Sequence, residues 1–219
     1  MGLIVDDIFT EAVADVALPS HTMTPIGSGW AELDRDSVEE IEAKFVTDQA
    51  GVDSTTGSSK ALYTAADVPD NADYDVALEI VTVPGSADDA LVLLLRVADS
   101  SNYYYAIGYR SSANPDLRIG KVVAGVVTNL STANVGGLTA IAEFRFRVRG
   151  STLSIRRDDV EALTASDGVL TAKGLGGWGM GNVEIANDDV GSPWRLDRFL
   201  LDEVPAAGGG VPSVNASLL

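Results

Sequence analysis

The chain has 219 residues and a formal net charge of −17, with 32 acidic and 15 basic side chains. Its hydrophobic fraction of 46% supports a sizeable core and excludes wholesale disorder. It contains no cysteine, which excludes disulfide scaffolds and cysteine-based metal sites or catalysis. A strongly acidic chain repels nucleic acid and anionic membrane, so we expect neither as a partner.

The acidity is concentrated in the first half of the chain. Residues 1–99 carry 20 acids and 4 bases, a net charge of −16. The N-terminal apolar residues are followed at once by Asp6 and Asp7, which does not resemble a signal peptide. No stretch approaches the roughly 18 apolar residues of a membrane span. We therefore expect a soluble protein made in a cytoplasm, without signal peptide or transmembrane segment.

The hydrophobic pattern predicts strands almost throughout. Apolar residues alternate and turn residues interrupt the chain every eight to twelve positions or so, which is typical of a sandwich or barrel. The predicted strands are a short one around Trp30, then 75–83, 90–98, 103–110, 117–123, 126–130, the two arms of a hairpin within 143–157, the glycine-rich 174–180, and 194–202.

Two neighbouring predicted strands have distinctive faces. The segment ALVLLLRVA (90–98) is apolar on both faces, which indicates a central strand covered on both sides or one that faces a groove; Arg96 falls on the face of Val92 and Leu94. In the strand that follows, alternation places Tyr103, Tyr105, Ile107 and Tyr109 on one face, and Tyr104 and Arg110 on the other.

Five of the 15 basic residues lie in EFRFRVRGSTLSIRR, residues 143–157. Alternation points Phe144, Phe146 and Val148 inward and the arginines outward, with the hairpin turn at Gly150 and Ser151. Arginine suits an outer strand face because its stem covers apolar surface while its head stays in water. Nearby acidic residues could pair with the arginines: Glu143, Asp158, Asp159 and Glu161.

The order of these signals resembles the concanavalin A-like jelly roll, and within it the laminin-G-like type, which recurs in minor tail and other virion proteins of tailed bacteriophages. The motifs that carry the resemblance are Asp7-Ile8-Phe9, SGWAEL, LRVADSSNYYYAIGY, LRIGKVVAGVVTNL, FRVRGSTLSI and Asp197-Arg198-Phe199. The resemblance implies an antiparallel two-sheet β-sandwich over residues 1–203, with the two chain ends adjacent and Phe9 near Phe199. It does not imply one function, because this fold carries lectins, glycosidases, lyases and structural modules.

The uncharged residues 204–219 predict a flexible C-terminal arm, either without a partner or docking on a neighbouring subunit through Leu218 and Leu219. The arginine face is a second candidate protein interface, formed by Arg145, Arg147, Arg149 and Arg156, which could meet an acidic patch on another copy. The alternative is a solvated face whose charges are balanced within the molecule.

Glycan binding would use aromatic platforms with a few fixed polar groups. The candidate residues are Tyr103, Tyr105, Tyr109, Arg96, Arg110 and Trp178, although tyrosines in such a run could equally be core residues. We expect Trp30 to be buried.

Calcium is the one cofactor for which the sequence offers material, because acidic turns supply the oxygen ligands that it prefers. The candidate ligands are Asp70, Asp73, Asp75 and Asp99, and the alternative is that these residues cap turns.

Catalysis is not expected. Laminarinase-like members of the fold use Glu-x-Asp-x-Glu on a central strand, whereas Glu32-Leu33-Asp34-Arg35-Asp36 ends in Asp and lies early in the domain. The single histidine, His21, has no motif around it. We predict a non-enzymatic virion protein, a minor tail protein acting in attachment or decoration. The alternatives are a capsid decoration protein and a lectin-like module that engages a host-surface glycan. Its partners would be other virion proteins, copies of itself or that glycan.

Overall fold

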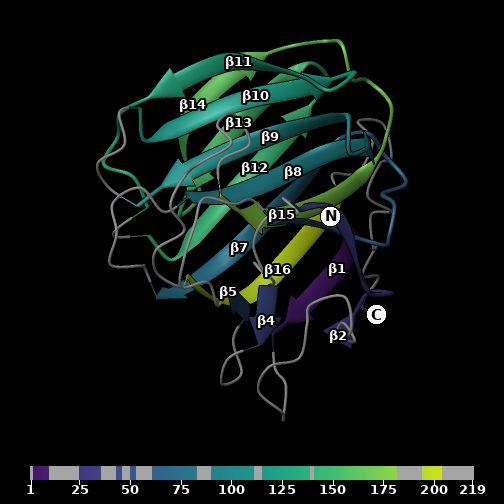
Figure 1. Ribbon diagram of the computed structural model, residues 1–219, viewed down its shortest axis with the longest axis vertical. Helices are drawn as coiled ribbons and strands as arrows, with labels where there is room; N and C mark the ends of the chain where they lie inside the picture. Colours follow the sequence, from purple (N-terminus) through teal and green to yellow (C-terminus); the bar gives the residue numbers. More distant parts are fainter. Residues whose placement is uncertain are drawn as a thin grey trace, which may run out of the picture.

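The computed structural model describes residues 2–9, 25–35, 43–45, 50–52, 61–82, 90–110, 115–138, 141–181 and 194–203. They form two antiparallel sheets packed face to face, as predicted (Figure 1). These residues include no helix, and so none of the length and apolarity needed to cross a bilayer.

The nine-stranded sheet lies at the back in Figure 1. Its main path runs in the order β14 (Val160–Ser166), β13 (Thr152–Arg157), β12 (Glu143–Arg149), β7 (Tyr74–Thr82), β16 (Arg195–Glu203), β1 (Gly2–Ile8) and β2 (Pro25–Ile26). Two short strands extend it, with β5 (Ala50–Val52) pairing with β16 and β4 (Ala43–Phe45) pairing with β5.

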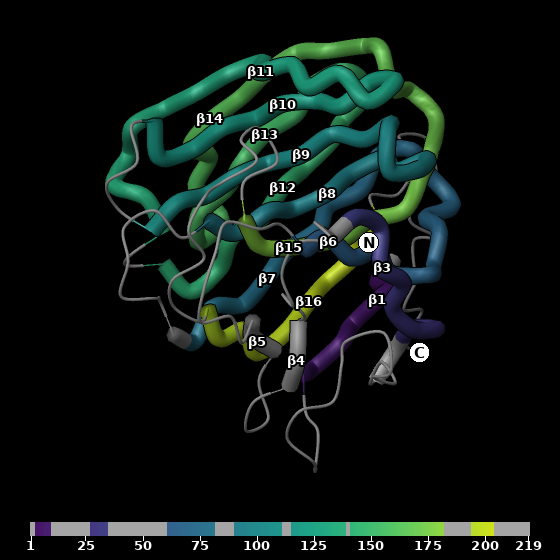
Figure 2. The backbone as a smooth tube through the Cα atoms, viewed as in Figure 1, coloured from purple at the N-terminus to yellow at the C-terminus, as the bar shows by residue number. Residues whose placement is uncertain are grey.

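The seven-stranded sheet lies in front. Its order is β11 (Val126–Ala133), β10 (Leu117–Val123), β9 (Asn102–Tyr109), β8 (Ala90–Asp99), β15 (Leu175–Met180), β6 (Ala61–Ala65) and β3 (Trp30–Arg35). At one end of the sandwich the edge strands of the two sheets, β11 and β14, run side by side (Figure 2).

The first and last strands of the described chain are neighbours. β1 pairs antiparallel with β16, with Asp7 opposite Phe199. Trp30 joins these two ends, because its ring lies 6.3 Å from that of Phe9 and 4.8 Å from that of Phe199. The expected closeness of Phe9 and Phe199 and the expected burial of Trp30 are both confirmed.

The space between the sheets holds the main core. The predicted inward residues of the 143–157 hairpin, Phe144, Phe146 and Val148, have no exposed surface, nor do Val76 and Leu78 of β7. The alternation of apolar residues in the sequence therefore assigned these faces correctly, because side chains of a strand point to opposite faces in turn.

A second buried cluster lies on the seven-stranded sheet alone, on the face away from the nine-stranded sheet. We call it the tyrosine face; its members are Leu62, Ala90, Val92, Leu94, Val97, Tyr103, Tyr105, Ile107, Tyr109 and Val122. Three further residues of β8, Leu91, Leu93 and Leu95, belong to the main core. The two-sided burial predicted for β8 is therefore confirmed.

Strand β14 was not predicted from the sequence. Its residues VEALTAS include Glu161, and only Leu163 is buried, so the hydrophobic alternation that marks a strand is weak. Residues 204–219, including Leu218 and Leu219, lie outside the described residues, as do His21 and Asp36.

Candidate functional site

Three of the six predicted glycan-binding residues, Tyr103, Tyr105 and Tyr109, come together on the tyrosine face. The rings of Tyr103 and Tyr105 meet edge to face, with centroids 6.5 Å apart. Each of the three tyrosines is at most 2% exposed, so they form the floor of this face rather than an open platform.

Gly120 makes room for the Tyr105 ring. The two residues lie opposite each other on β10 and β9. A Cβ atom at position 120 would lie 2.1 Å from the Tyr105 hydroxyl oxygen, closer than two unbonded atoms can approach. Glycine is therefore required here by the neighbouring side chain.

Arg118 was missed as a site residue by sequence reasoning. Its guanidinium carbon lies 5.2 Å from the centre of the Tyr109 ring, in the range of a cation–π contact. Arg110 follows Tyr109 directly at the end of β9, and both arginines are half-buried. Strict alternation in LRIGKVV would have revealed Arg118, because it shares a strand face with Gly120 and Val122.

The turn beside Arg118 is held by a buried carboxylate. Asp116 accepts hydrogen bonds from the backbone N–H groups of Val135, Gly136 and Gly137, at 2.7 to 3.0 Å. The Leu138 N–H in turn donates to the carbonyl oxygen of Tyr109 at 2.9 Å. These bonds fix the end of the tyrosine face at which Arg118 lies.

An acidic residue, Asp34, lies at the opposite side of the tyrosine face. Burial, and then the negative charge of Asp34, raise the pKa of the Tyr103 hydroxyl above its ordinary value. A register shift in β3 places Asp34 opposite Leu62 of the tyrosine face, but Glu32 opposite Tyr63 of the main core. The two described carboxylates of the Glu-x-Asp motif therefore lie opposite residues of different faces, unlike a pair that acts on one glycosidic bond.

Arg96 departs from its predicted position. A register shift interrupts β8 after Leu95, and Arg96 has a positive φ of 50°, so alternation breaks before Val97, which rejoins the tyrosine face. The Arg96 guanidinium is directed to loops instead, donating to the carbonyl oxygens of Ala72, Leu170 and Gly150. Arg96 is 3% exposed, and its side chain links three loops instead of facing a ligand.

Trp178 also lies elsewhere than expected. It is fully buried in the main core, where its ring is 5.9 Å from Phe9 and 6.3 Å from both Trp30 and Tyr63. β15 is flanked by β8 and β6, and alternation turns this tryptophan toward the nine-stranded sheet. No part of its ring is accessible to a glycan.

Among the described residues no group of three or more acidic or histidine side chains is suited to a metal, so the four candidate calcium ligands do not form one. Asp73 accepts hydrogen bonds from Arg96 and from the backbone of Gly150. Asp99 caps its own turn through Ser101 and Asn102, and these bonds lower its pKa. Asp70 is exposed.

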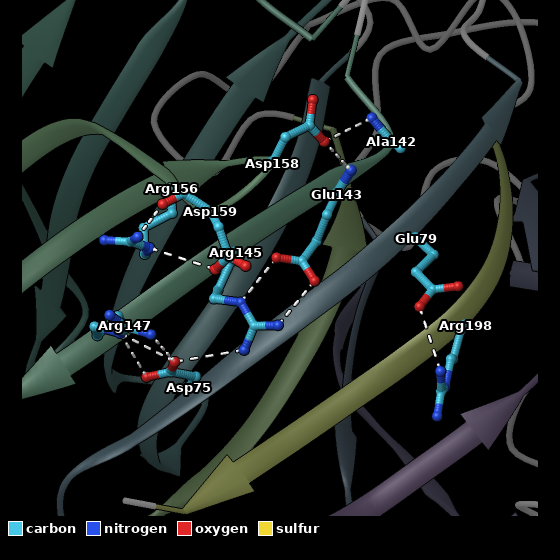
Figure 3. Close-up of polar contacts among 10 residues, drawn as sticks. All are labelled: Asp75, Glu79, Ala142, Glu143, Arg145, Arg147, Arg156, Asp158, Asp159 and Arg198. Atoms are coloured by element: carbon cyan, nitrogen blue, oxygen red, sulfur yellow. Dashed lines mark hydrogen bonds and ion pairs between the residues drawn. The ribbon is translucent and has the colours of Figure 1, made fainter.

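Asp75 is surrounded by arginines instead of a metal. Its carboxylate is fully buried and pairs with Arg147 at 2.7 Å and with Arg145 at 3.4 Å (Figure 3). Arg149 is a third partner, also at 2.7 Å. Arg145 also forms a two-bond pair with Glu143. Burial alone would lower the pKa of Arg145, but Glu143 and Asp75 together raise it.

The predicted arginine face is thus paired within the molecule. Arg147 lies opposite Asp75 in the register of β12 and β7, which brings the basic segment onto an acidic residue 72 positions earlier. Arg156 bonds to the carbonyl oxygen of Asp159 in the adjacent turn (Figure 3). Arg147 and Arg149 still have more than a quarter of their side chains exposed, so an interface with another copy stays a prediction.

Hydrogen bonds to Asp167 link the two sheets near β14. Asp167, after β14, accepts hydrogen bonds from Lys121 at 2.5 Å and from the Tyr104 hydroxyl at 2.6 Å. Burial would raise the pKa of Asp167, but these two donors lower it overall. Burial, followed by the hydrogen bond to Asp167, raises the pKa of Tyr104 to about 12.

The arrangement offers chemistry for recognition. At the Arg118 end of the tyrosine face, guanidinium donors lie over an aromatic ring and beside a fixed turn, and such donors suit hydroxyl or carboxylate groups. The ten residues of the tyrosine face are aliphatic or tyrosine.

Comparison with known proteins supports the fold. No family model matches the sequence, and no curated protein matches it. Solved structures are similar. They include a carbohydrate-binding module, CBM66, from Bacillus subtilis (15% identity, 80% of this chain and 92% of that chain, TM-score 0.52) and a Bacillus licheniformis beta-glucanase (8%, 89% and 100%, 0.54). A legume lectin-like domain from Entamoeba histolytica is also similar (11%, 80% and 91%, 0.51). The predicted jelly-roll class is therefore confirmed, and these identities establish the fold alone.

Proposed function

We propose that this chain is a non-catalytic, lectin-like module that binds a glycan at the Arg118 end of the tyrosine face. The observation that carries the proposal is the contact between the Arg118 guanidinium and the Tyr109 ring. Arginine can donate two parallel hydrogen bonds to neighbouring oxygen atoms, and the Asp116-bound turn holds this end in place. Carbohydrate-binding and lectin-like names among the similar structures support the same ligand class.

The absence of catalysis is part of the proposal, although a glucanase shares the fold. Glycoside hydrolysis needs two carboxyl groups about 5 to 10 Å apart on either side of the scissile bond. Within the described part of the seven-stranded sheet, Asp34 lies on the edge strand and Glu32 lies opposite a core residue.

A glycan array followed by calorimetry on a positive glycan tests this function. We expect Arg118→Ala to weaken binding at least about tenfold, a loss of roughly 1.4 kcal/mol, while the melting temperature stays close to that of the parent. Arg156→Ala, on the other sheet, is the matched control and should bind normally. Failure of every glycan to bind, or equal binding by Arg118→Ala, would refute the proposal.

The resemblance to virion proteins of tailed bacteriophages supports a second candidate, a minor tail protein in attachment or decoration, or a capsid decoration protein. This candidate would locate the chain in the virion, with other virion proteins or copies of itself as partners. Labelling the chain in assembled particles tests it directly. Label on the tail or on the head would separate the two versions, and unlabelled particles would argue against both.

A further inference from the structure

Strand β11 offers an accessible surface beside the buried tyrosine face. The three tyrosines of that face are at most 2% exposed, so a ligand does not reach their rings directly. Arg118 on β10 is half-buried, whereas Asn129 and Thr132 on β11 are exposed. A ligand that reaches Arg118 therefore approaches it over β11 rather than over the tyrosine rings.

Strand register assigns Asn129 and Thr132 to the same face as Arg118. In the pairing of β10 with β11, Thr132 lies opposite Arg118, and Asn129 lies opposite Gly120. Residues directly opposite each other in an antiparallel pair stand on the same face of the sheet. On their other side, the same two residues of β10 lie opposite members of the tyrosine face on β9. The two β11 residues therefore continue the tyrosine face by one strand.

A β-bulge in β11 brings these two side chains onto one face. Asn129 and Thr132 are three positions apart, so strict alternation would point them to opposite faces. The register shift leaves Leu130 without an opposite residue on β10, and Leu130 packs against the main core. Ser131 lines the groove beside β14, and Thr132 returns to the outward face. Bulges commonly re-aim side chains in this way next to functional sites.

The chemistry of the two side chains suits sugar hydroxyl groups. The Asn129 amide and the Thr132 hydroxyl can each donate and accept hydrogen bonds. Within the described part of the chain, neither side chain has a hydrogen-bond partner. Residues 122–142 contain no charged side chain, so this surface suits an uncharged sugar better than an acidic one.

We propose that the glycan site continues from Arg118 onto β11, where Asn129 and Thr132 bind neighbouring hydroxyl groups of a second, uncharged sugar. This inference rests on the glycan binding proposed above and adds the second sugar to it. Neighbouring strands lie about 5 Å apart, so the path from Tyr109 on β9 to Thr132 on β11 covers about 10 Å. That span is longer than one sugar ring, so the ligand is an oligosaccharide.

Calorimetry tests the second sugar. The probes are the oligosaccharide that binds the parent most tightly on the glycan array and the single sugars that compose it. The parent should bind the oligosaccharide at least about tenfold more tightly than any of the single sugars. Asn129→Ala/Thr132→Val removes the proposed hydrogen bonds and should lose this advantage, about tenfold in affinity. Its affinity for the single sugars and its melting temperature should stay close to those of the parent.

Thr128→Val is the matched control for the Thr132 change. Thr128 is an exposed threonine of the same strand, but it lies opposite Lys121. The Lys121 side chain points to Asp167 near β14, on the other side of the sheet from Arg118. Thr128→Val should therefore bind every probe like the parent.

Two outcomes would refute the second sugar but leave glycan binding in place. One is a double variant that binds the oligosaccharide like the parent while Arg118→Ala still weakens binding. The other is an equal loss of affinity for the single sugars, which would mean that the double variant disturbs Arg118 instead. If no glycan binds the parent, both proposals fail.

Discussion

At the scale of single residues, the arginines of β12 pair with a carboxylate of the same molecule. Asp75 forms ion pairs with three arginines that the sequence pattern directs outward, and it is fully buried. The outward direction was predicted correctly, but the partner could not be, because β7 and β12 are adjacent only in the folded sheet.

Gly120→Ala tests how closely the tyrosine face is packed. The new methyl group would overlap the Tyr105 ring and approach the carbonyl oxygen of Thr128 at 2.8 Å. We expect the free energy of unfolding in urea to fall by about 1–3 kcal/mol, as for other overpacked cores. Gly168→Ala is the control, because a Cβ there meets no atom within 4 Å. An equal effect of both changes would contradict this account.

Asp202→Asn tests whether the half-buried carboxylate of Asp202, opposite Asp75 in the nine-stranded sheet, lowers stability. Burial raises the pKa of Asp202; Arg145 opposes that shift, and Asp75 adds to it. A raised carboxyl pKa in the folded state means that folding favours the protonated form, so the charged form costs stability at neutral pH and this cost disappears as pH falls.

Asp202→Asn should therefore raise the melting temperature at pH 7, with a gain that shrinks toward acidic pH. Scanning calorimetry at several pH values measures it. Asp197→Asn, an exposed residue of the same strand, should show little change at any pH. A variant less stable than the parent at pH 7 would show that the Asp202 carboxylate stabilises the fold.

At the scale of elements, irregularities in strands decide which residues reach a site. The register shift in β8 moves Arg96 off the tyrosine face, and the shift in β3 separates Glu32 from Asp34. Alternation assumes an uninterrupted pleat, and one extra residue reverses the face of everything that follows.

Arg96→Met tests the clamp that results from the β8 irregularity. The change would leave the carbonyl oxygens of Ala72, Gly150 and Leu170 without this donor. A buried unsatisfied group costs about 1–3 kcal/mol, but these three carbonyls belong to half-buried or exposed residues that water can reach. We therefore expect a total loss of about 1–3 kcal/mol in unfolding free energy.

Hydrogen exchange gives this prediction a local readout. The Gly150 amide donates to Asp73. It should exchange faster in Arg96→Met than in the parent, whereas amides at the centre of β9 should exchange at the same rate in both. Lys173→Met, an exposed substitution, should change neither stability nor exchange. Unchanged protection of the Gly150 amide would mean that the turn does not depend on Arg96.

At the scale of the whole molecule, a net charge of −17 acts against the compact state through self-repulsion. Screening should relieve it, while the buried Asp75 cluster is screened less. We expect the melting temperature to rise between about 50 mM and about 500 mM sodium chloride. A lower melting temperature at high salt would mean that attractive surface pairs outweigh the repulsion.

Much of the architecture follows from the sequence alone. The alternation in 75–83 and 143–157, the continuous apolar run 90–98 and the turn residues between them predicted strand positions, inward faces and the all-β class. The resemblance to the jelly-roll fold also predicted that Phe9 lies near Phe199, and the rings of both contact Trp30.

Only the tertiary structure decided which distant residues share a site. In the folded chain Asp75 pairs with the arginines, Trp178 is buried in the core, and Arg118 lies over the Tyr109 ring. These outcomes depend on strand order and on the position of each register shift, which are set by long-range pairing and packing. A local pattern contains neither, since it records which face a residue takes on its strand but not which strand lies beside it.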